Sequence, residues 1–180
     1  MIEQNEVINE VWRSISGYLN YQVSNIGRVR NMTTIKILKN TLDKGDGYYK
    51  IRLNNDGDWK GHLIHRLVAQ EFLDKPVVGH KVLVDHIDRN RINNQVSNLR
   101  YVSESQNQMN KSKKVNGTSM YKGVCWDKTY KRWKAQIVID KRTIHLGYFD
   151  NELDAAKVYN EKATGHYKEF ACINHVLSGS

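Results

Sequence analysis

The chain has 180 residues, of which 39% are hydrophobic and 26% charged, a composition typical of a globular rather than a disordered protein. No run approaches about eighteen apolar residues, and the only two cysteines form no CxxC pair. This argues against a membrane span, a four-cysteine zinc site and a disulfide framework. The formal net charge is +9; residues 111–180 hold 13 Lys/Arg against 7 Asp/Glu, and residues 1–110 hold 15 against 12. This excess favours a polyanionic partner, most simply nucleic acid. The alternative is a solvated lysine surface.

Short strands and tight turns fill the first third of the chain. Apolar and polar residues alternate between turn signals at Gly17 and at residues 25–27. Residues 54–58 form a strong hairpin turn signal. The predicted strands cover residues 11–18, 21–30, 47–53 and 59–64, with a further short apolar piece at residues 35–38.

A helix is expected next, over residues 65–73. Leu67, Val68 and Phe72 recur at helical spacing there, and the only proline, Pro76, lies just beyond the expected end. His65, at the start of this helix, is more typical of a packing residue than of a ligand.

The central stretch, residues 83–107, combines side chains that suit phosphodiester hydrolysis. A short apolar strand leads into Asp85-His86, a loop rich in Asn and Arg follows, and a second strand runs into a helix that begins near Ser103. His86 can act as a general base, since its ordinary pKa lies near neutrality. Asp85 and Asn107 offer oxygen ligands that suit Mg²⁺ or Mn²⁺. Asn98 can accept a hydrogen bond from the other ring nitrogen of His86 and so fix its tautomer.

Each of these assignments has a plainer alternative. An Asp-His pair more often begins a turn than forms a catalytic site, and Asn-rich loops usually only cap and turn. The combination therefore carries more weight than any single residue.

The C-terminal part begins after a polar, basic linker at residues 110–118. Residues 121–126, 132–139 and 143–149 read as three antiparallel strands, and in the middle strand apolar and mostly polar residues alternate from Trp133 to Ile139. Asp150 is the expected cap of a helix that ends near Gly165 and covers the Trp133 side of the sheet. The other side is expected to be exposed and basic.

Residues 83–107 resemble the HNH (ββα-metal) nuclease motif of phage- and intron-encoded homing endonucleases. The matching residues are Asp85, His86, Asn98, Leu99, Arg100 and Asn107, with His65 to Ala69 upstream. The resemblance implies that His86 is the general base, that Asn98 orients it, and that Asp85 and Asn107 bind the metal. The last position is Asn where His is commoner, and the cysteine pairs of many bacterial relatives are absent.

Two further segments resemble DNA-associated modules. Residues 12–29 look like the nuclease-associated modular motif that often precedes this catalytic unit. Residues 119–174 resemble an APETALA2-type DNA-binding domain, in which a three-stranded sheet enters the DNA major groove. By matching position, and with Arg100 added from the central motif, the expected DNA contacts are Lys122, Trp126, Lys134, Gln136, His145 and Arg100. For Trp126 an exposed packing role is an equal alternative.

Together these observations predict an α+β protein with an HNH core and a C-terminal three-stranded sheet covered by one helix. The expected divisions are a nuclease-associated module (1–55), an HNH core (56–109), a linker (110–118), an APETALA2-like domain (119–174) and a flexible tail (175–180). The expected function is that of a site-specific homing endonuclease leaving 5′-phosphate and 3′-hydroxyl ends. The alternatives are a non-catalytic DNA-binding regulator with a relic HNH motif and a weakly specific phage nuclease.

The expected partner is double-stranded DNA, bound by a monomer or weak dimer without a membrane or a small-molecule cofactor. The N-terminus has no basic region followed by an apolar run, so no secretory signal is expected. We therefore expect the protein in the cytoplasm of a bacterial host, at the nucleoid when it is bound to DNA.

Overall fold

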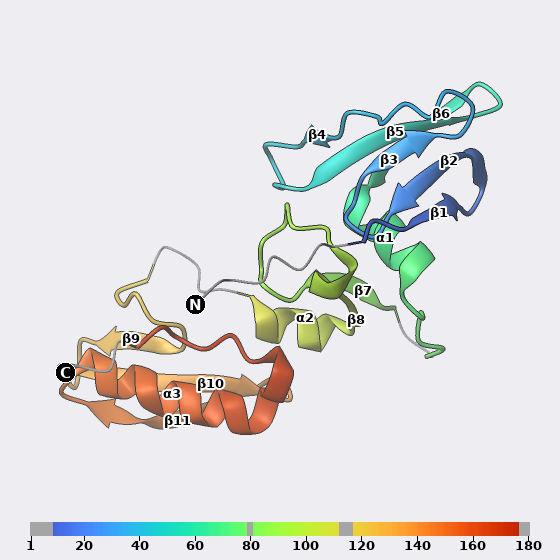
Figure 1. The fold of residues 1–180 in the computed structure, drawn as a ribbon. Coiled ribbons are helices and arrows are strands. Elements are labelled where there is room, and N and C mark those ends of the chain that lie inside the picture. The colour runs from blue at the N-terminus through green and yellow to red at the C-terminus, as the bar shows by residue number, and fades with distance from the viewer. Residues whose placement is uncertain (1–8, 79–80, 112–116, 177–180) are drawn as a thin grey trace, which may run out of the picture. The chain divides into compact units, whose positions relative to one another are not determined.

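The computed structural model describes residues 9–78, 81–111 and 117–176, and the chain divides into two compact units at Glu104/Ser105 (Figure 1). The expected linker lies partly outside the described residues, at 112–116, and so does most of the expected tail, at 177–180. No helix among the described residues is long and apolar enough to cross a membrane.

The first unit begins with an antiparallel sheet in the order β1–β2–β3. Its strands are β1 (Trp12–Ile15), β2 (Tyr18–Ser24) and β3 (Val29–Asn31). Both turns lie where glycine was expected to mark them: Gly17 has φ +81° and Gly27 has φ +84°. Glycine suits both positions because the left-handed region is open to it without a steric penalty.

A second sheet of three strands follows, in the order β4–β5–β6. Its strands are β4 (Thr41–Leu42), β5 (Tyr49–Asn55) and β6 (Asp58–Leu63). The hairpin turn between β5 and β6 has two residues with positive φ, Asp56 and Gly57, as a tight two-residue hairpin requires. The apolar piece at residues 35–38 contributes one isolated bridge, Arg30 to Ile37, rather than a strand.

Helix α1 (Ile64–Phe72) joins both sheets to the central stretch through a common core. The predicted helix is confirmed within one residue at each end. The buried residues of this core come from β1, β2, β3, β5, α1 and β8, and are Ile15, Tyr21, Val23, Val29, Ile51, Leu53, Ile64, Leu67, Val68 and Leu99. A continuous apolar core of this kind fixes the positions of the loops that leave it.

The central stretch forms a short antiparallel hairpin followed by a helix, as expected. Its elements are β7 (Leu83–His86), the 3₁₀ turn η1 (Val96–Asn98), β8 (Leu99–Val102) and α2 (Glu104–Asn110).

The second unit contains the expected three-stranded antiparallel sheet, in the order β11–β10–β9, with one long helix on one face (Figure 1). Its elements are β9 (Val124–Asp127), β10 (Arg132–Ile139), β11 (Arg142–Phe149), α3 (Glu152–Tyr167) and η2 (Lys168–Phe170). Ala135 packs with Ala155 and Ala156, and Trp133 packs against them, so the Trp133 face is the covered one.

Both expected ends of this helix differ from the structure. Asn151, rather than Asp150, is the cap, because its Oδ1 accepts a hydrogen bond from the Leu153 amide at 2.8 Å. The Asp150 carboxylate instead pairs with Arg132 at 2.9 Å. The helix continues through Gly165 to Tyr167, where burial of Tyr167 stabilises the last turn.

Candidate active site

Strand β7 ends on the two residues that the sequence analysis placed at the centre of the site. Asp85 and His86 are 8% and 4% exposed, and lie opposite Arg100 and Leu99 of β8. Both side chains are therefore withdrawn from bulk water, and electrostatic interactions are stronger in this protein interior than they would be in water.

The Asp85 carboxylate is held by a cross-strand ion pair. Its Oδ2 accepts hydrogen bonds from Arg100 Nη2 at 3.1 Å and Nε at 3.2 Å, and both side chains are largely buried. A fork of two guanidinium N–H groups fixes the carboxylate in direction as well as in charge. The structure thus places Arg100, an expected DNA contact, directly on Asp85.

The His86 ring meets an amide that the sequence analysis did not single out. His86 Nε2 lies 3.2 Å from Asn94 Oδ1, and both residues are buried. Burial lowers the pKa of His86 below its ordinary value, although the Asn94 hydrogen bond acts in the opposite direction. The imidazole is therefore neutral at neutral pH and retains one nitrogen lone pair.

Two aromatic rings pack beside His86. The ring centroids of His65 and Tyr48 lie 5.0 Å and 5.9 Å from that of His86. Arg91 stacks over Tyr48 at 5.0 Å and donates a hydrogen bond to the Asp46 carbonyl. Tyr48 therefore packs beside the imidazole, although the sequence pattern predicted only the start of a strand there.

His65 is a buried, neutral histidine. Burial, followed by the nearby His86, lowers its pKa to about 3. Its Nδ1 is one of the few buried polar atoms without a hydrogen-bond partner among the described residues. Packing of its ring against His86 and Tyr48 accounts for its position.

The loop after His86 is organised around one carboxylate, that of Asp88. It accepts hydrogen bonds from the Asn90 amide, from Asn93 Nδ2 and from Asn98 Nδ2, at 2.7 to 2.9 Å. Burial acts against ionisation, but these hydrogen bonds lower the pKa of Asp88. The carboxylate therefore serves as the anionic anchor of residues 88–98.

Asn98 closes this loop from its far end. Its Oδ1 accepts a hydrogen bond from the Asp88 amide at 3.0 Å, and its Nδ2 donates to Asp88 Oδ1 and to the Asn93 carbonyl. Asn98 was expected to bond to the His86 ring; in the structure Asn94 bonds to that ring, and Asn98 braces the loop. The neighbouring Asn93-Asn94 pair was visible in the sequence, but its two roles depend on the folded loop.

Asn107, the other expected metal ligand, lies on α2 and belongs to the second unit. Within residues 9–78, 81–111 and 117–176, no three His, Cys, Asp or Glu side chains are grouped so that they could hold a metal ion. The candidate ligands are thus a carboxylate and an amide, oxygen donors that match hard cations rather than zinc.

The sheet of the second unit separates the expected DNA contacts. Lys134 and Gln136 alternate with the covered Ala135 and Ile137, so they lie on the face away from α3. His145 pairs with Gln136 across the strands and is exposed.

Trp126 and Lys122 are placed differently. Trp126 stacks edge to face on Trp133, with ring centroids 5.1 Å apart, at the margin of the helix-covered face. The Lys122 ammonium donates to the carbonyls of Met109 and Lys111. Lys134, Gln136 and His145 are therefore brought together, whereas Trp126 and Lys122 lie apart from them.

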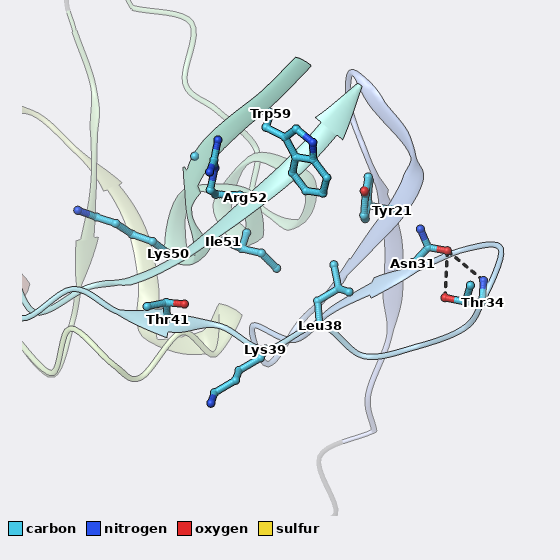
Figure 2. A pocket seen from close by; sticks show the side chains of 11 residues that line it. Tyr21, Asn31, Thr34, Leu38, Lys39, Thr41, Lys50, Ile51, Arg52 and Trp59 are labelled. Carbon is cyan, nitrogen blue, oxygen red and sulfur yellow. Dashed lines mark hydrogen bonds between the residues drawn. The ribbon is translucent and has the colours of Figure 1, made fainter. Parts of the chain in front are cut away.

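A cleft of about 700 Å³ lies between the two sheets of the first unit. Figure 2 shows Trp59, Tyr21, Leu38 and Ile51 around it, with the Lys39 and Arg52 side chains extending from its rim. The third cation, Lys50, is ion-paired with Asp43 and Asp46 at 2.6 and 2.8 Å. Sequence periodicity could not predict this cleft, because it lies between two separate sheets.

Comparison with known families identifies two segments of the first 109 residues. Residues 10–54 match the NUMOD4 motif, and residues 62–109 match the HNH endonuclease family. The second match includes Asp85, His86, Asn94 and Asn98, and also Asn107 on α2.

Individual relatives extend this finding. The chain is 41% identical over 104 residues to DNA endonuclease I-HmuI of Bacillus phage SP01, covering 56% of this chain and 58% of that protein. It is 36% identical over 96 residues to an uncharacterized HNH endonuclease, L245, of Acanthamoeba polyphaga mimivirus (53% and 28% covered). It is 32% identical over 90 residues to H-N-H endonuclease F-TflII of Escherichia phage T5 (50% and 46% covered).

A solved structure shows the same fold. It is described as "DNA binding and cleavage by the HNH homing endonuclease I-HmuI", and it matches with a TM-score of 0.50 and 41% identity, over 54% of this chain and 55% of that one. The chain thus spans less than two thirds of each of these relatives.

Proposed function

We propose that this chain is a member of the HNH homing endonuclease family, and that it is a site-specific DNA endonuclease that hydrolyses one phosphodiester bond per catalytic event. The products are a 5′-phosphate and a 3′-hydroxyl. The observation that carries the proposal is the buried, neutral imidazole of His86, held by an amide and lying next to the ion-paired Asp85 at the end of β7.

His86 is the proposed general base. Because burial lowers its pKa, the ring is neutral at neutral pH and can take a proton from the attacking water. Asn94 Oδ1 on Nε2 favours the tautomer in which that nitrogen carries the proton and Nδ1 carries the lone pair. The base is then ready without a prior deprotonation step.

Asp85 and Asn107 are the proposed ligands of the divalent cation. HNH endonucleases use divalent metal ions, and the oxygen donors of these two residues fit Mg²⁺ or Mn²⁺. When bound, such an ion would stabilise negative charge on the phosphate and on the leaving oxygen. Arg100 keeps the Asp85 carboxylate in a fixed orientation through its two hydrogen bonds.

Asn98 acts on the site through the loop that follows His86. Its amide bridges Asp88 and Asn93, and Arg89 within this loop has the unusual φ of +67°. Backbone in such a conformation persists only where its surroundings fix it. We therefore assign Asn98 to loop geometry, which in turn sets the direction of the His86 side chain.

The sheet of the second unit is the proposed anchor on DNA, in the manner of an APETALA2-like domain. The support is the cluster of Lys134, Gln136 and His145 on the face away from α3. A lysine there supplies phosphate affinity, and an amide can read a base edge. Contacts within the chain compete with DNA binding by the other three expected residues, Trp126, Lys122 and Arg100.

The experiment is strand-resolved cleavage mapping with the whole chain. DNA that flanks the coding locus, and random DNA of equal length, are incubated with Mg²⁺, Mn²⁺ or EDTA, and the ends are analysed. We expect metal-dependent cuts at one position of the flanking DNA, with a 5′-phosphate at each cut. Tight binding without cutting would instead support the regulator, and cuts scattered over both DNAs would support a weakly specific nuclease. One cut strand or two would separate a nick from a double-strand break.

A further inference from the structure

We propose that Asn94 is the positioning residue of the base His86, and that the turn Ser24–Arg28 at the end of β2 holds Asn94 in place. The turn of the first sheet is then a working part of the active site. This inference rests on the proposed function and adds to it the device that orients the base.

The first observation is the direction of the Asn94 amide. Its Nδ2 donates to the Ile92 carbonyl at 3.2 Å, which leaves Oδ1 facing His86 Nε2 at 3.2 Å. An amide oxygen only accepts, so the ring nitrogen opposite it must carry the hydrogen. With Asn94 6% and His86 4% exposed, water does not compete freely for this bond.

The second observation is that the turn contacts and hydrogen-bonds to the loop that carries Asn94. The Val96 amide donates to the Asn25 carbonyl at 2.7 Å. A Cβ added to Gly27 would lie 2.7 Å from Asn94 Cβ and 3.2 Å from Ile64 Cγ2. The backbone of the turn at Gly27 is therefore in direct contact with the loop that carries Asn94 and with the start of α1. Only glycine leaves enough room for both contacts.

The third observation is that the turn is itself rigid. Ser24, which is fully buried, accepts from the Gly27 amide through its carbonyl and from the Arg28 amide through Oγ, both at 3.0 Å. The Asn25 side chain accepts from the Val11 amide and donates to the Asn9 carbonyl. These bonds lie outside the HNH segment and, except for the one to Asn9, within the NUMOD4 segment, so the turn that contacts Asn94 is fixed mainly from the NUMOD4 segment.

The chain provides a matched control for Gly27. Gly17 lies in the same sheet with nearly the same φ, +81° against +84°, but a Cβ added there meets nothing within 4 Å. Gly17→Ala and Gly27→Ala thus share the backbone penalty, and only the second change pushes against Asn94.

The test joins kinetics to a direct measurement of the imidazole. In single-turnover cleavage at saturating DNA, Asn94→Ala and Gly27→Ala should cleave about 10- to 100-fold more slowly, a loss typical of a group that orients a functional histidine. Their Kd for DNA should stay within about twofold of the parent value, as expected when ground-state binding is untouched. Gly17→Ala should match the parent in both respects, and Asn94→Asp, which keeps an oxygen at Nε2, should recover part of the rate.

The second measurement is ¹⁵N NMR of the histidine rings, with His86 assigned from His86→Gln. In the parent, Nε2 of His86 should carry the hydrogen; in Asn94→Ala the ring should become a mixture of tautomers, and in Gly17→Ala it should not change. A parent ring protonated on Nδ1, or equal cleavage by Gly27→Ala and Gly17→Ala, would overturn the inference. If the parent cuts no DNA, the proposed function fails, while the tautomer measurement still decides the role of Asn94. If Gly27→Ala does not fold, Asn94→Ala carries the test.

Discussion

The two units of this chain bury different kinds of side chain. Within the described part of the first unit, the buried polar or charged residues are Ser24, His65, Asp85, His86, Asn94 and Asn98. In the described part of the second unit they are Asn110 and Ser119 alone, and the long helix α3 instead buries Ala155, Ala156 and Ala163 against the sheet.

This difference matches the roles proposed for the two units: the first holds the base of the active site, and the second presents a sheet face to DNA. Buried polar groups cost free energy unless they are hydrogen-bonded, so the bonds of the buried Asn98 to Asp88 and of the buried Asn94 to His86 hold these side chains in one arrangement. The second unit is stabilised by close packing, which leaves the opposite face of its sheet open to a partner. Changes to the hydrogen-bonded residues around β7 should therefore affect chemistry, and changes to the sheet of the second unit should affect folding or affinity.

Among the changes that bear on this comparison, the largest effect is expected from Asp85. Asp85→Asn keeps the shape of the side chain but removes the charge that pairs with Arg100 and that would hold the cation. We expect the single-turnover cleavage rate to fall at least ~100-fold, as for the loss of a group that supports a metal site. The measurement is the rate over a Mg²⁺ titration. Asp74→Asn, an exposed carboxylate of the same unit, is the control, and a parent-like rate for Asp85→Asn at saturating Mg²⁺ would refute the assignment.

A change in the second unit should act on folding instead. A Cβ added to Gly123 would lie 2.0 Å from Tyr159 Cδ2 and 2.7 Å from the Gln136 carbonyl, with φ at +76°. Gly123→Ala should therefore lower the free energy of unfolding of this unit by about 2–4 kcal/mol, through overpacking and backbone strain. Chemical denaturation followed by tryptophan fluorescence measures it.

Gly57→Ala is the control for this change. Gly57 also has positive φ, +91°, but has open space around it, so its substitution should cost only about 1 kcal/mol. Equal destabilisation by both variants would show that packing against Tyr159 is not what Gly123 provides.

Acid should destabilise the first unit through His65. Its folded pKa is about 3, below the ordinary value of 6.5. The unfolded chain therefore binds this proton first, and stability is lost as pH falls from about 6.5 toward 3. Between pH 7 and pH 5 the loss should be about 2 kcal/mol. Urea unfolding at both pH values measures it. His65→Phe should flatten this part of the curve, and an unchanged pH dependence in that variant would contradict the explanation.

The smallest effect is expected on the open sheet face. Lys134→Gln removes one proposed phosphate contact, so DNA binding should weaken a few-fold and the slope of log Kd against log salt should decrease by about one. Fluorescence anisotropy over a salt series is the measurement. Lys162→Gln, an exposed change on α3, should leave the slope as it is. Identical slopes for the two variants would argue against DNA binding by this face.

Local patterns accounted for most of the fold. The alternation from Trp133 to Ile139 predicted which face α3 covers, and the helix over residues 65–73 followed from apolar spacing, because both signals lie within one element. The cap was misassigned by one residue because Asp150 and Asn151 are both good caps, and the choice depends on Arg132 from another strand.

The candidate site was predicted less completely. The residue types of Asp85 and His86 pointed to the chemistry. The pairing of Asp85 with Arg100 could also be predicted, because both lie on two strands joined by one loop. Asn94, Tyr48 and Gly27 were not, because their roles depend on contacts between segments far apart in the sequence. Such contacts have no local periodicity.

The proposed chemistry depends on the neutral imidazole of His86, which removes the proton from the attacking water. Its most direct test is the single-turnover rate of supercoiled DNA cleavage by His86→Ala and by the parent, with Mg²⁺ and with the DNA affinity of each measured. We expect His86→Ala to lose about 10²- to 10⁴-fold in rate with little change in affinity. Cleavage by His86→Ala as fast as by the parent would contradict it.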